Sequence, residues 1–175
     1  MKTRLLLSSL AALSLLRAEA PTSGFRADFL RQLADVEKKV TSLAQAMPQE
    51  KYSWRPAEGV RSVSEVFVHI AGANFLFPNF AGVKPPAGVD RNAEKTVTNK
   101  AEVVALIKKS FDHARTAITG LSDADMDKPT KLFGRETVTR EVFFIMANHM
   151  HEHLGQAIAY ARTGGVTPPW SMKEN

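Results

Sequence analysis

Three of the five histidines of this chain lie within five residues, in the stretch His149-Met150-His151-Glu152-His153. Imidazole nitrogens bind divalent metals and exchange protons near neutral pH, so such a cluster can form a metal site or an acid–base pair. The chain has no cysteine. A thiol of the chain therefore serves neither as nucleophile nor as ligand, and nitrogen and oxygen atoms must hold any metal.

A helical arrangement divides these histidines between two faces. At about 100° per residue, His149 and His153 are one turn apart on one face, and His151 lies on the opposite face. We expect the first face to look toward the core and His151 to face solvent, with Glu152 at the edge of the inner face. The inner stripe also contains Val142, Ile145, Gln156 and Tyr160.

Two imidazoles on an apolar face are costly to bury unless their nitrogens find partners. His69 is the candidate third group, because it lies at the inner edge of a second helical stripe, near the level of Glu65. His69, His149 and His153 would offer three neutral nitrogen ligands and leave other coordination positions open. Spacing alone leaves a pair of hydrogen-bonded core histidines as the alternative. His113 is expected at the surface.

Four amphipathic stretches must position these residues. Apolar residues at helical spacing predict helices over residues 23–47, 62–77, 100–119 and 139–163. Ser62 and Glu65 form a capping-box sequence, and Pro78 is expected to end the second helix. No strand is predicted, and Leu132-Phe133 is assigned to a loop. The pattern favours an all-α four-helix bundle.

The first twenty residues have the pattern of a secretory signal peptide. Lys2 and Arg4 precede an apolar run over residues 5–16, and Ala18-Glu19-Ala20 follows. The run of about 12 residues is short of the roughly 20 that span a bilayer. We expect cleavage after Ala20, a single domain over residues 21–175, export to the periplasm or the extracellular space, and no stable membrane insertion of the mature chain.

Charge and motifs exclude several classes of function. Cleavage would remove three basic residues and one acidic residue, which lowers the formal charge from +5 to +3. Without a basic cluster, this balance disfavours a nucleic-acid partner. The zincin motif H-E-x-x-H is absent, because Met150 follows His149 and Gly155 lies where His151 would need its partner. The nucleophile elbow G-x-S-x-G, the P-loop and G-x-G-x-x-G are absent as well.

Three segments resemble a known family. They are Tyr52-Ser53-Trp54-Arg55-Pro56, the stretch 62–70 that contains His69, and the stretch 149–156, which reads H-x-x-x-H-x-G-Q. Over nearly all of the mature chain, the sequence resembles the DinB-like superfamily of four-helix-bundle metalloproteins, which includes transferases that depend on bacillithiol, mycothiol or glutathione. The resemblance implies that His69, His149 and His153 bind a divalent metal, most often zinc or nickel.

The resemblance also implies a reaction class, a thiol S-transferase or a hydrolase that uses metal-bound water, acting on an unidentified small molecule. Export disfavours the thiol version, because the usual thiol cofactors are cytosolic. The alternative is a non-catalytic bundle that binds a metal or a small ligand, since only Glu65, Glu152 and Gln156 are placed to assist. Gln156 could bond a ligand imidazole or a metal-bound water. By analogy with other bundles of this kind, the protein could form a homodimer.

Loop residues would control access to such a site. The side chains expected around its mouth, as an aromatic wall and cationic docking points, are Trp54, Arg55, Phe133, Arg135 and Trp170. In the plainer interpretation, the two tryptophans only cover the ends of the bundle.

Overall fold

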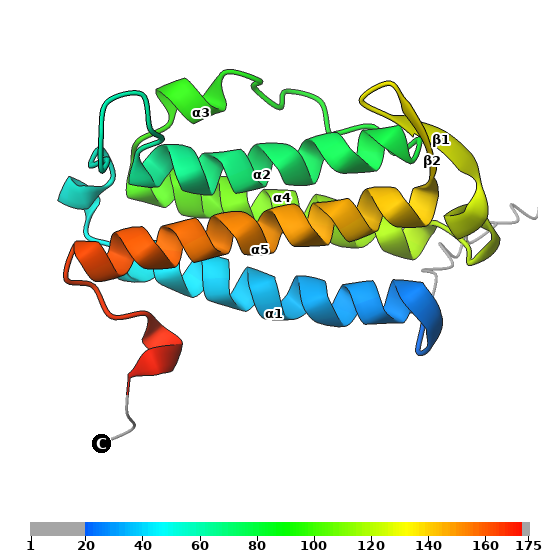
Figure 1. Ribbon diagram of the computed structural model, residues 1–175, viewed down its shortest axis with the longest axis horizontal. Helices are drawn as coiled ribbons and strands as arrows, with labels where there is room; N and C mark the ends of the chain where they lie inside the picture. Colours follow the sequence, from blue (N-terminus) through cyan, green and yellow to red (C-terminus); the bar gives the residue numbers. More distant parts are fainter. Residues whose placement is uncertain (1–19, 173–175) are drawn as a thin grey trace, which may run out of the picture.

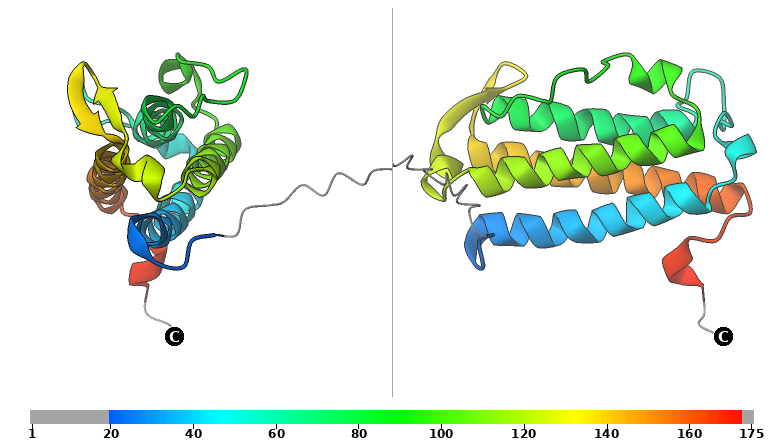
Figure 2. Two further views of the ribbon diagram at one scale, coloured as in Figure 1. Left: turned by 90° about the vertical axis from the view of Figure 1, so that its right-hand side faces the viewer. Right: turned by 180° about the vertical axis from the view of Figure 1, so that it is seen from behind.

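Four long helices form the body of the protein in the computed structural model, which describes residues 20–172 (Figure 1). They are α1 (Gly24–Ala46), α2 (Val63–Phe80), α4 (Lys100–Gly120) and α5 (Thr139–Thr163). Both α1 and α2 pack against α4 and α5, and the end-on view in Figure 2 shows the four helices at the corners of a bundle. The prediction of a four-helix bundle is confirmed. The predicted signal peptide lies outside the described residues, apart from Ala20.

The apolar stripes predicted from the sequence form the core of this bundle. In α1, the side chains of Phe29, Leu33, Val36, Val40 and Leu43 are buried. Tyr52 is also buried, and its hydroxyl donates a hydrogen bond to the carbonyl oxygen of Ala44 at 2.7 Å, which fixes the loop after α1. Within residues 20–172, no helix combines the length and the hydropathy that a membrane span requires.

Helix α2 begins as predicted and ends later. Ser62 and Glu65 form the capping box: the Ser62 hydroxyl accepts from the amide of Glu65 at 3.3 Å, and the Ser62 amide donates to the Glu65 carboxylate at 2.7 Å. The predicted stop at Pro78 was wrong, because α2 continues to Phe80. A proline in the last turn removes a single helical hydrogen bond, and the side chain of Pro78 is buried.

Short elements complete the fold. Between α1 and α2 lies η1 (Gln49–Lys51), and between α2 and α4 lies the four-residue helix α3 (Ala93–Thr96), which packs on α2. The segment after α4 contains η2 (Ala124–Asp127) and the strands β1 (Pro129–Leu132) and β2 (Arg135–Val138). The last element is η3 (Pro169–Ser171), which packs on α1.

The prediction of no strand was wrong, because β1 and β2 form an antiparallel hairpin. Leu132 pairs with Arg135, so the turn consists of Phe133 and Gly134 alone, with φ angles of 50° and 87°. Two-residue hairpin turns with positive φ at both positions usually have Asn-Gly or Asp-Gly. Phe-Gly lacks that signal, which is why the sequence did not reveal the hairpin.

The prediction that His113 lies at the surface was wrong as well. Its side chain is buried, with its ring 5.7 Å from that of Phe75 on α2. Helix α4 packs against both α1 and α2, so its buried face is wider than the single stripe seen in the sequence. Burial lowers the pKa of His113, and its Nε2 atom has no hydrogen-bond partner within the described residues.

Candidate metal centre

The three histidines singled out in the sequence meet between α2 and α5. Each offers a ring nitrogen, and the three nitrogens lie within 4.8 Å of one another. The rings of His69 and His149 each lie 4.5 Å from that of His153, centroid to centroid, and 4.9 Å from each other. We refer to His69, His149 and His153 as the histidine triad. Its donor set and spacing could hold a metal ion.

The triad lies at the edge of the core and not at its centre. Helix α5 points Phe143, Met146 and Met150 deepest into the bundle, whereas His149 and His153 are half-buried one turn apart beside α2. The predicted stripe of α5 is therefore rotated from the core toward the seam with α2. This placement shields one side of the imidazoles and leaves the other accessible.

Hydrogen bonds fix the orientation of two of the rings. Nδ1 of His69 lies 2.8 Å from a carboxylate oxygen of Glu94, and Nδ1 of His153 lies 2.9 Å from the amide oxygen of Gln156. Both oxygens can only accept, so both Nδ1 atoms carry the proton. The Nε2 atoms of His69 and His153 are therefore left with free lone pairs, the form in which imidazole binds metals.

His149, the third member of the triad, has no acceptor of this kind bonded to its Nδ1. Its Nε2 lies 3.0 Å from Nε2 of His69, and its Nδ1 is buried with no hydrogen-bond partner within the described residues. Since Nε2 of His69 carries the lone pair, Nε2 of His149 donates the proton between them. Binding of a metal through Nε2 of His149 would require its proton to move to Nδ1, which is the tautomer that His69 and His153 already have.

Burial favours the neutral form of two members of the triad, His149 and His69. It lowers the pKa of His149 to about 4, with the nearby His153, His69 and Arg61 acting in the same direction. The pKa of His69 is also lowered by burial, although the hydrogen bond to Glu94 opposes this effect. Neutral imidazole is the form that binds a metal, so both shifts favour metal binding by His69 and His149 near pH 7.

Glu94 is the site residue that the sequence did not reveal. Its other carboxylate oxygen accepts from Nε of Arg61 at 2.8 Å. Burial alone would raise the pKa of Glu94, but the hydrogen bonds from Arg61 and His69 outweigh it and the pKa is lowered. Glu94 belongs to α3, and nothing in the local pattern of that polar loop region marks this residue.

Of the three neighbouring groups predicted from the sequence, only Gln156 bonds a member of the triad. Glu65 is buried in the capping box and pairs with Lys95 at 2.9 Å and Arg55 at 3.2 Å. The structure shows Glu152 exposed on α5, and neither carboxylate has a hydrogen bond to the triad within residues 20–172. The expectation that Glu65 and Glu152 assist the site therefore has no contact to support it.

His151 lies where the helical wheel places it. It is exposed, and its Nδ1 bonds the carbonyl oxygen of Ala147 at 2.8 Å, within its own helix. His151 thus offers a natural control for substitutions in the triad.

Two aromatic residues expected at the mouth flank the triad at opposite ends. Trp54 contacts the ring of Tyr160 edge to face at 5.4 Å, and the Tyr160 hydroxyl accepts from Gln156 at 3.0 Å. This contact links Trp54 to the His153 end. At the other end, Phe133 lies 6.1 Å from Phe77, whose ring is 5.7 Å from that of His149.

The other mouth candidates are placed elsewhere. Arg135, the first residue after the hairpin turn, pairs with Glu141 of α5 at 2.6 Å, and Arg55 donates to the carbonyl of Val60 at 2.7 Å. Trp170 belongs to η3 on α1. Of the five predicted residues, Trp54 and Phe133 remain as flanking groups of the site.

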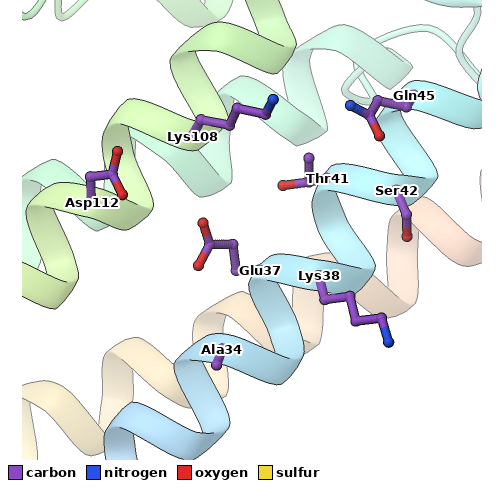
Figure 3. A pocket seen from close by; sticks show the side chains of 8 residues that line it. All are labelled: Ala34, Glu37, Lys38, Thr41, Ser42, Gln45, Lys108 and Asp112. Atoms are coloured by element: carbon purple, nitrogen blue, oxygen red, sulfur yellow. The ribbon is translucent and has the colours of Figure 1, made fainter.

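A surface hollow of about 480 Å³ lies between α1 and α4, away from the seam of α2 and α5 (Figure 3). Its side chains carry both signs of charge, with Glu37, Lys38, Lys108 and Asp112 around Thr41. It contains no histidine. Because the hollow lacks a convergent set of donors, we assign the candidate site to the triad.

Comparison with known proteins gives consistent results. The sequence model of the DinB superfamily matches residues 32–157. The YjoA protein of Bacillus subtilis (strain 168) is 26% identical over 129 residues, which are 71% of this chain and 81% of YjoA.

Solved structures share the fold. A DinB-like protein from Bacillus cereus ATCC 10987 aligns with a TM-score of 0.73 at 21% identity, over 81% of this chain and 93% of that chain. The DinB-like protein YjoA from Bacillus subtilis aligns with a TM-score of 0.65 at 21% identity, over 80% of this chain and 93% of that chain. At this identity the likeness concerns the four-helix architecture.

Proposed function

Because the chain belongs to the DinB superfamily, we propose that its histidine triad binds one divalent metal ion, zinc or nickel, and that the protein is an exported metal-dependent enzyme acting on a small molecule. The observation that carries this proposal is the orientation of the rings. Glu94 and Gln156 each hold an Nδ1 atom, which directs two lone pairs toward the point that His149 also approaches. Three neutral nitrogens suit zinc or nickel better than magnesium or calcium.

A divalent metal with an open position lowers the pKa of a bound water or a bound thiol, which supplies a nucleophile at neutral pH. Two reaction classes follow, transfer of a small thiol to an electrophile and hydrolysis by water. The thiol must come from outside, because the chain has no cysteine. The residues of the chain hold the ligand rings, and the seam between α2 and α5 shields one side of them.

Activity with defined metals tests this proposal. The protein would be stripped with a chelator, reloaded with zinc or nickel, and assayed with electrophiles plus small thiols and with esters and amides. We expect turnover that disappears on stripping, returns on reloading, and is absent in His69→Ala but kept in His151→Ala. Turnover that is indifferent to the metal, or no turnover on either panel, would contradict the enzymatic assignment.

One observation favours a second candidate, a non-catalytic bundle that binds a metal or a small ligand. Two carboxylates that could act as a base already have partners: Glu94 bonds His69 and Arg61, and Glu65 bonds the N-terminal cap of α2. An enzyme that moves protons would need a free base or would have to rely on the metal-bound group itself. Stoichiometric metal binding, with no turnover either of electrophiles plus thiols or of esters and amides, would favour this candidate.

Export is the part of the proposal that depends on residues 1–20. Fractionation of cells that express the full chain tests it. We expect a mature form that begins at Pro21 in the periplasm or the medium, and a full-length form in the cytosol would contradict export.

A further inference from the structure

Phe133 occupies a position that seldom suits an aromatic residue. It has a left-handed backbone with φ 50°, and 69% of it is exposed to solvent. A bulky residue in this conformation is strained, and Asn or Asp usually fills the first position of such a hairpin turn. The geometry of the turn therefore does not require a phenylalanine, and exposure of an apolar ring to water is unfavourable. Departures from local rules of this kind concentrate at functional sites.

The ring of Phe133 continues an aromatic path that ends at the triad. It contacts Phe80 at 5.0 Å and Phe77 at 6.1 Å, both on α2 and both edge to face. Phe77 is buried and its ring lies 5.7 Å from that of His149. The hairpin thus covers α2 with an aromatic surface beside the His149 end of the site.

The surroundings of the three imidazoles differ in polarity. Behind His69 lies the charged pair of Glu94 and Arg61, and behind His153 lies the amide of Gln156. His149 instead has an aromatic ring as its neighbour and a buried Nδ1 without a partner in the described part of the chain. The site therefore has two polar sides and one apolar side, and Phe133 extends the apolar side outward.

We propose that Phe133 is a specificity-determining residue, whose exposed ring binds the apolar substituent of a small molecule that the triad holds through a metal. This inference rests on the proposed metal site and names its ligand class: a metal-binding head group joined to an aromatic or alkyl group. The head group lies at the histidines, and the apolar group lies along Phe133 toward the hairpin.

Ligand binding to the cobalt-loaded protein, prepared without a histidine tag, tests this inference. Cobalt in a nitrogen site absorbs visible light, and titration would compare acetohydroxamate with 3-phenylpropanohydroxamate, which have the same metal-binding head group. Burial of a phenyl ring on an aromatic surface should make the phenyl compound bind about tenfold more tightly. In Phe133→Asn we expect this preference to fall to about twofold or less, since the apolar surface is lost.

Phe133→Asn should fold, because Asn suits the turn. Phe144→Asn is the matched control, since Phe144 is 57% exposed on α5 and should leave the preference unchanged. The inference is overturned if wild type shows no preference, or if Phe133→Asn keeps it while cobalt still binds. Failure of wild type to bind cobalt is a different outcome, which overturns the proposed metal site and this inference with it.

Discussion

Glu94 and His69 are 25 residues apart in the sequence, yet a carboxylate oxygen of Glu94 accepts a hydrogen bond from Nδ1 of His69 at 2.8 Å. Arg61 holds the other oxygen of the same carboxylate at 2.8 Å. The contact gives the four-residue helix α3 a role in the site, because it fixes the tautomer and the rotation of an imidazole on α2. A carboxylate in this position also makes the imidazole a stronger donor to a metal.

The first prediction concerns this carboxylate. Glu94→Gln should weaken zinc binding about 10- to 100-fold, because a neutral amide orients and polarises His69 less well than a carboxylate. Competition with a chromophoric chelator measures the affinity. Glu58→Gln, which changes an exposed loop carboxylate, is the control and should bind as wild type does. Equal affinity for Glu94→Gln and wild type would show that Glu94 serves only the fold.

Gln156 on α5 should also affect metal affinity, because its amide oxygen orients the ring of His153. Gln156→Leu removes the acceptor for Nδ1 of His153, and we expect a loss in cobalt affinity of about tenfold. Gln156→Glu keeps an acceptor and should retain affinity or strengthen it. The visible spectrum of the cobalt protein reports both binding and ligand geometry. If Leu and Glu had the same effect at this position, the hydrogen bond to His153 would not be the cause.

Tyr52 allows a prediction about stability that is independent of metal. Its buried hydroxyl donates to the carbonyl of Ala44, and Tyr52→Phe leaves that carbonyl without this donor. We expect the free energy of unfolding in urea to fall by about 1–2 kcal/mol. Ser53→Ala, an exposed change next to it, should have little effect. A Tyr52→Phe protein as stable as wild type would mean that water replaces the hydroxyl.

His113 gives a pH dependence of known sign. Burial lowers its pKa in the folded state, so between that pKa and the unfolded value of about 6.5 the unfolded chain binds more protons. Stability of the metal-free protein should therefore fall as the pH drops below about 6.5. Burial lowers the pKa of His69 and of His149 as well, the latter to about 4, so both residues act in the same direction.

Substitution separates His113 from His69 and His149. His113→Leu should reduce the loss of stability between pH 7.5 and pH 5, because one titrating group is gone while His69 and His149 remain. Urea unfolding with chelator present at both pH values measures this difference. His151→Leu is the matched control, since it makes the same exchange at an exposed position of α5. An unchanged pH dependence in His113→Leu would show that His113 is protonated without cost in the folded protein.

The sequence predicts the main helices well, because long apolar stripes at helical spacing are a local property. The fourth predicted helix, residues 139–163, coincides with α5, and the third falls one residue short of α4. The hairpin escaped prediction because its turn breaks the usual residue preference at Phe133. The extension of α2 past Pro78 depends on burial, which local rules do not contain.

The site shows the same division between local and long-range information. His149 and His153 can be paired from their spacing on one helix, and His69 joins them through the family motif and the geometry of a bundle. Glu94 could not be found in this way, because its bond to His69 depends on how the loop between α2 and α4 folds back. His113 was misplaced because the width of the buried face of α4 depends on both neighbouring helices.

The central claim is that the histidine triad binds a metal, and metal content tests it most directly. Mass spectrometry would measure zinc and nickel in protein purified without chelators and without a histidine tag. We predict close to one metal per chain in wild type and in His151→Ala, and loss of the metal in His69→Ala, His149→Ala and His153→Ala, with circular dichroism confirming that each variant is folded. A wild-type protein that holds no metal and cannot be reloaded would contradict the account, as would a loss in His151→Ala equal to that in the triad variants.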